Sequence, residues 1–213
     1  MTSAHKLPHP TSKAVPGWLA VPAEGDRAPV WDAPVPRPAD SRTPVIWLLG
    51  AHGGAGVSTL ESMWAPAADS QRGWPSAEKA PFVVVVARMH TVGLNAAHRL
   101  CLQHQAGEVG GCSLLGLVTV AASPGKPDLT LSRRRELVAA AAGASWHIDW
   151  VPELLTSEPT ELAQWTPDYT PPPAKRFARP LAPTDAVPES VATAAAEVFA
   201  AAGEQWRTRR ADK

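Results

Sequence analysis

The sequence predicts an α/β protein in which a parallel sheet lies between two layers of helices. Short apolar runs typical of buried strands alternate with helical segments between residues 45 and 155. Such alternation favours a parallel sheet with right-handed crossovers. Prolines are sparse in the same stretch, since five of 23 fall in 45–150, nine in 1–44 and nine in 151–213. The Pro-poor stretch is therefore expected to hold the sheet.

The proline distribution also predicts the domain organisation. Proline lacks a backbone N–H and fixes φ, so Pro-dense segments cannot supply helix interiors or central strands. Four segments are expected: a Pro-rich extended or disordered arm over 1–44, the α/β domain over 45–155, a Pro-rich linker over 156–187 and a C-terminal amphipathic helix over 188–213. Spaced apolar residues of the first arm are candidates for docking on another surface; they are Trp18, Leu19, Val30 and Trp31.

The pattern within the domain predicts each element in turn. Buried strands are expected over 45–49, 82–87, 114–120 and 145–150. Helices are expected over 58–65, 91–107 and 132–142 and from about residue 188. Pro66 is expected to end the first helix, and Gly143 is expected at the residue after the third.

Charge and apolar patterning exclude several classes of protein. Twenty basic and twenty acidic residues give a formal charge of zero, so nucleic-acid binding by bulk charge is not expected. No apolar run approaches the roughly 20 residues that span a bilayer, and the first residues lack the apolar core of a signal peptide. Two cysteines do not make a disulfide framework. We therefore expect a cytoplasmic protein with reduced thiols and no membrane span.

The turn after the first strand carries the sharpest motif. Residues 50–59 read GAHGGAGVST, a glycine-rich loop between an apolar strand and a helix start. Glycines let backbone N–H groups converge on a phosphate, and a helix N-terminus favours negative charge. The candidate binding residues are Gly53, Gly54, Ala55, Gly56, Val57, Ser58 and Thr59.

This loop resembles the deviant Walker A motif of the ParA/MinD superfamily of P-loop ATPases, in particular its TadZ/CpaE-like and actinobacterial MinD-like members. It is also similar to the loop of an uncharacterised actinobacterial family, which shares the motifs at 122–125 and 146–152. The resemblance covers roughly residues 45–155. It implies ATP and Mg²⁺ as cofactors, with the Ser58 hydroxyl at the metal position and Thr59 beside the α-phosphate.

The departures from that pattern concern the charged residues. His52 stands where the family has its signature lysine, and Val57 stands where it has the phosphate lysine. The strongest strand ends in Arg88 and offers no Walker B carboxylate for Mg²⁺. Only about fifteen residues separate Pro66 from Pro81, too few for the family's usual switch strands. Since valine supplies neither phosphate binding nor transition-state charge, we expect a shortened domain that keeps the fold but not the turnover.

The leading interpretation is therefore a pseudo-ATPase that acts through protein contacts, with plasmid partition, conjugation or secretion as its setting. The Pro-rich arms and exposed tryptophans are its expected contact elements. One alternative is a weak ATP-binding switch that retains the phosphate-binding loop. Another is a structural adaptor without a ligand. The sequence leaves open whether the chain forms a homodimer.

Other polar residues favour structural roles. The set His98, Cys101, His104 and Cys112 resembles a zinc pattern, but helical spacings of three and six place the two histidines far apart on the helix surface. Asp149 is expected on an exposed strand face, and Arg133–Arg135 on a solvated helix start. No Ser/His/Asp or paired-carboxylate pattern supports a hydrolase.

Overall fold

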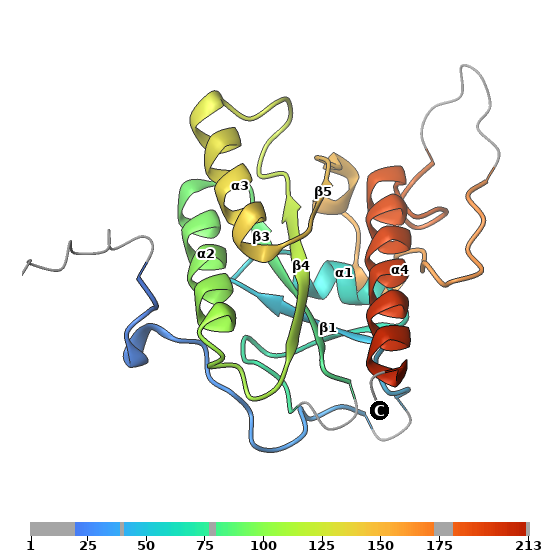
Figure 1. The fold of residues 1–213 in the computed structure, drawn as a ribbon. Coiled ribbons are helices and arrows are strands. Elements are labelled where there is room, and N and C mark those ends of the chain that lie inside the picture. Colours follow the sequence, from blue (N-terminus) through green and yellow to red (C-terminus); the bar gives the residue numbers. More distant parts are fainter. Residues whose placement is uncertain (1–19, 39–40, 77–79, 173–180, 212–213) are drawn as a thin grey trace, which may run out of the picture.

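A computed structural model describes residues 20–38, 41–76, 80–172 and 181–211. Its centre is a five-stranded, all-parallel sheet in the order β2-β1-β3-β4-β5 (Figure 1). The strands are β1 (Ile46–Gly50), β2 (Ala67–Asp69), β3 (Phe82–Arg88), β4 (Ser113–Val120) and β5 (Ser145–Ile148). The α-helices are α1 (Val57–Met63), α2 (Thr91–Gln105), α3 (Leu129–Ala142) and α4 (Glu189–Ala211). The predicted three-layer α/β class is confirmed.

Both faces of the sheet are buried, each under its own cluster of apolar side chains. Successive residues of a strand point to opposite faces, so each strand contributes to both clusters. In β1, Ile46 and Leu48 pack in a cluster with α1 and α4. Trp47 and Leu49 pack on the opposite face with α2 and α3. Figure 1 shows the two helical layers on either side of the sheet. A central strand in this setting has no solvent-facing side, which explains why β3 is apolar from Phe82 to Ala87.

The edge strand β2 is absent from the strands that the sequence predicts. Ala67, Ala68 and Asp69 pair in parallel register with Ile46–Leu48 of β1. The stretch between Pro66 and Pro81, expected to be too short for the usual switch strands of ParA/MinD proteins, does hold this one short edge strand. Three residues, two of them alanine, carry neither periodicity nor strand propensity, so the pairing with β1 decides their conformation.

The N-terminal segment 20–38 packs against the α2 side of the sheet. Val30 forms a bridge with Trp74, and the Trp31 indole N–H donates to the Ser70 carbonyl at 2.9 Å. The expected docking of Val30 and Trp31 thus takes place on the chain's own domain, while Trp18 and Leu19 lie outside the described residues. The described part of the β2–β3 connection forms no helix. The N-terminal segment helps to cover this part of the sheet instead.

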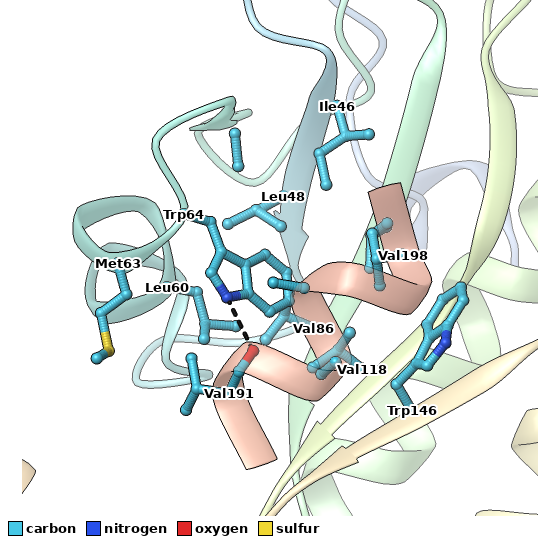
Figure 2. Close-up of a cluster of buried hydrophobic side chains, with 14 of the residues drawn as sticks. Ile46, Leu48, Leu60, Met63, Trp64, Val86, Val118, Trp146, Val191 and Val198 are labelled. Atoms are coloured by element: carbon cyan, nitrogen blue, oxygen red, sulfur yellow. Dashed lines mark hydrogen bonds between the residues drawn. The ribbon is translucent and has the colours of Figure 1, made fainter. Parts of the chain in front are cut away.

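Helix α4 covers the face of the sheet opposite α2, where it contacts the end of α1 through aromatic side chains. Trp64, which follows α1, is fully buried, and its indole N–H donates to the Val191 carbonyl of α4 at 3.3 Å (Figure 2). Phe199 of α4 packs edge-on against Trp64 and stacks on Trp165. The C-terminal helix is therefore part of the hydrophobic core. None of the helices within the described residues is long and apolar enough to cross a membrane.

Candidate functional site

The glycine-rich loop lies at the point where the crossover connections of the sheet diverge. Strands β1 and β3 are neighbours, yet α1 follows β1 on one face and α2 follows β3 on the other. In open α/β sheets, ligands bind outside the carboxyl ends of the strands at such a switch point. Residues 51–56, which follow β1, and Met89 and His90, which follow β3, flank this point.

The backbone of the loop has the conformation that its glycines allow. Gly54 (φ 77°) and Gly56 (φ 103°) are left-handed, and Gly56 is the N-cap of α1. Within the described residues, the amides of Gly53, Gly54 and Gly56 donate to no protein acceptor, whereas Ala55 N–H donates to the His52 carbonyl at 3.3 Å. The first-turn amides of a helix also lack intrahelical partners. The loop thus offers several N–H groups to an anion.

His52 connects the loop to β3 through a hydrogen bond. Its Nε2 accepts the backbone N–H of Arg88 at 3.1 Å, while its Nδ1 lies 2.8 Å from the Gly53 carbonyl oxygen. This pair of contacts fits the neutral tautomer with the proton on Nδ1. The ring of His90 lies 5.0 Å away, centroid to centroid. Two imidazole rings therefore lie side by side next to the carboxyl ends of β1 and β3.

Arg88 links the ends of three strands. Its Nε donates to the Gly54 carbonyl at 3.2 Å, and its Nη1 donates to the Ala121 carbonyl after β4 at 3.0 Å. The guanidinium thus lies against the glycine-rich loop. A cation therefore stands at the carboxyl end of β3.

The predicted loop residues divide between the surface and the core. Gly53, Gly54 and Ser58 are exposed, and Gly56 and Thr59 are half-buried. Ala55 and Val57 belong to the apolar cluster between the sheet, α1 and α4. The side chain of Val57 is therefore part of the hydrophobic core.

His90 and Gly93 pack beside His52, and the sequence gives little sign of either contact. His90 is the N-cap of α2, and its Nδ1 accepts the Gly93 N–H at 2.9 Å. Burial, together with His52 and Arg88, lowers the pKa of His90. A Cβ added at Gly93 would lie 2.5 Å from the Arg88 carbonyl oxygen and 2.8 Å from His52 Nε2. A glycine in the first turn of a helix is the one available signal, because it indicates close packing.

The residues of the zinc-like pattern make structural contacts. His104 Nε2 accepts the Leu114 N–H at 3.2 Å, and Cys112 Sγ lies 3.0 Å from the Pro75 carbonyl oxygen. Burial raises the pKa of the Cys101 thiol to about 12 and that of Cys112 to about 11, so both are protonated at neutral pH. Within the part of the chain that the structure describes, no three His, Cys, Asp or Glu side chains form a metal-binding group.

Three further expectations are changed by the structure. Helix α3 begins at Leu129 with Asp128 as its N-cap, so Arg133–Arg135 lie beyond its first turn and not at its start. Strand β5 ends at Ile148, which places the exposed Asp149 just after the strand. Of the eight tryptophans within the described residues, Trp206 alone is exposed. Within the described residues, the expectation of several exposed tryptophans is therefore met by Trp206 alone.

Comparison with known proteins adds no relative. No family model matches the chain, and neither a curated protein nor a solved structure does.

Proposed function

We propose that this chain is a catalytically degenerate P-loop-like protein, similar to ParA/MinD proteins, that acts through protein contacts. Plasmid partition, conjugation or secretion would be its setting. The observation that carries the proposal is the position of Arg88, whose guanidinium contacts the loop at Gly54 and the end of β4 at Ala121. A guanidinium group cannot coordinate Mg²⁺, and its positive charge repels the metal ion.

The arrangement of His52 and Val57 supports the same proposal. Transition-state charge in phosphoryl transfer is neutralised by lysine and metal ions. His52 is instead engaged with β3, and Val57 lies in the core. The contacts that hold the loop against β3 and β4 are thus made by the chain itself.

A weak ATP-binding switch is the second candidate, and two observations favour it. The exposed amides of Gly53 and Gly54 have no protein acceptor within the described residues. The Arg88 guanidinium adds a positive charge beside them. Together these groups would attract phosphate oxygens without a metal ion.

Titration of the purified protein with a fluorescent ATP analogue, with and without Mg²⁺, tests both candidates. Gly56→Arg places a bulky cation at a left-handed position and is expected to abolish any binding to the loop. Ser58→Ala removes the hydroxyl at the metal position, and Ser62→Ala, one turn further along α1, is its matched control. Folding of each variant is checked by circular dichroism.

The outcomes separate the candidates. Absence of binding supports the protein-contact scaffold and overturns the switch. Binding that is equal with and without Mg²⁺ and is lost in Gly56→Arg supports the switch. Mg²⁺-dependent affinity that falls in Ser58→Ala but not in Ser62→Ala would contradict the degenerate site.

A further inference from the structure

A cleft of about 350 Å³ opens outside the carboxyl ends of β1 and β2, beside the N-terminal segment. It is lined by residues 26–29 of that segment, by Gln71 and Arg72 after β2 and by one side of α2. Gly50 and Ala51 complete the lining. A volume of this size lies at the lower end of the range for small-molecule sites.

The cleft concentrates positive charge in a chain whose formal charge is zero. Its lining holds three arginines, Arg27, Arg72 and Arg99, and one acid, Asp26, an excess of two positive charges. Arg27 pairs with Glu108 at 3.3 Å. Within the described residues, Arg72 and Arg99 have no acidic partner within 4.0 Å and both are exposed.

One wall of the cleft is fixed by a buried amide. Gln103 is 2% exposed, and its Oε1 accepts the Ala28 N–H at 3.0 Å. Its Nε2 donates to the carbonyl oxygens of Ala28 and Glu108, both at 2.9 Å. The two contacts with Ala28 hold the N-terminal segment beside α2. Arg27, adjacent to Ala28, is thereby positioned before any ligand arrives, which lowers the entropic cost of binding.

The opposite wall is held in a strained conformation. Gln71 (φ 55°) and Arg72 (φ 61°) are the non-glycine residues with left-handed backbone in the described chain. The turn is closed by the Gly73 N–H, which donates to the Ser70 carbonyl at 3.3 Å. Trp31 covers Gly73 so closely that a Cβ there would lie 2.5 Å from the indole. Strain of this kind persists where the surroundings enforce it, and it is common at ligand sites.

We propose that this cleft binds a small molecule that carries a phosphate or pyrophosphate group, with Arg72 and Arg99 as its charged ligands and Arg27 beside them. Guanidinium groups match phosphate oxygens in bidentate geometry. Arg72 and Arg99, which have no acidic partner within 4.0 Å in the described residues, match the charge of a phosphate monoester, about −1.5 to −2 at pH 7, better than that of a single carboxylate. The site is distinct from the amides of the glycine-rich loop and goes beyond the proposed function.

Isothermal titration with inorganic pyrophosphate at low ionic strength tests the proposal. We expect saturable binding with one site, weakened about tenfold by Arg72→Gln and by Arg99→Gln, since a charge-assisted hydrogen bond is typically worth that factor or more. Arg207→Gln, an exposed arginine of α4, is the matched control and is expected to bind as the wild type does. Gly56→Arg is also expected to keep this affinity, which separates the cleft from the glycine-rich loop.

Two further arms complete the experiment. Arg72→Gly removes the charge and relieves the left-handed strain, so its melting temperature is expected to rise while its affinity falls. A variant that gains stability and keeps its affinity would overturn the role of Arg72. Citrate that binds as tightly as pyrophosphate would overturn the phosphate class. No saturable binding, or an equal loss in Arg207→Gln, would overturn the site.

Discussion

Replacement of Trp64 by alanine tests how α4 is held on the sheet. The side chain is fully buried between α1 and α4. A tryptophan buries about 150–250 Å², and at about 25 cal/mol per Å² this corresponds to roughly 4–6 kcal/mol. Burial relative to an extended chain is an upper bound. We therefore predict a loss of about 4 kcal/mol in the free energy of unfolding for Trp64→Ala, within the usual range for such truncations.

Urea denaturation followed by far-UV circular dichroism measures this loss. The control is Trp206→Ala, because Trp206 is 46% exposed and packs edge-on against Phe82 of β3. Since about half of its surface is buried, its expected cost is about 2 kcal/mol. Trp64→Phe retains one ring and loses the N–H donated to Val191, so its cost is expected to fall between the two. Equal losses in Trp64→Ala and Trp206→Ala would refute the buried contact between α1 and α4.

Three more predictions concern the site and its surroundings. Gly93→Ala is expected to destabilise the fold by about 1–3 kcal/mol in the same assay, since its Cβ would meet the Arg88 carbonyl at 2.5 Å; an unchanged urea midpoint would contradict this packing. Burial lowers the pKa of four histidines from 6.5, namely His90, His98, His104 and His147. The unfolded chain then binds more protons below pH 6.5, so stability is expected to be complete above that pH and to fall as the pH drops towards the folded-state pKa values; a urea midpoint at pH 5.5 equal to that at pH 7.5 would argue against it. The thiols of Cys101 and Cys112 are expected to resist Ellman's reagent at pH 8 until urea unfolds the chain, and rapid reaction of the native protein would show that they are not buried.

The four longer strands and the four α-helices were predictable from the sequence because each depends on local patterns. The apolar run of β3 and the Gly143 that ends α3 can each be recognised from a few consecutive residues. Strand β2 was not predictable, because its three residues become a strand only when β1 lies beside them. The packing of the N-terminal segment was equally hidden. It depends on two glycines whose missing side chains leave room for residues far away in the sequence. Trp31 packs against Gly73, and Val30 packs against Gly110.

The site was predictable only in part, for a similar reason. The glycine-rich loop is continuous in the sequence and could be found from its composition. The contacts of His52 and Arg88 join positions 36 residues apart. The cleft arginines come from three separate segments. A single sequence gives no distance between such positions, so the groups that surround the loop emerge only from the folded chain.

Phosphate release from ATP in the presence of Mg²⁺ tests the proposed loss of catalysis most directly. In that proposal Arg88, His52 and Val57 stand where an active ATPase would have its catalytic charges. The wild-type protein is expected to release no phosphate above the buffer background, at any Mg²⁺ concentration. Mg²⁺-dependent release that co-purifies with the protein and disappears in Gly56→Arg would contradict the degenerate site.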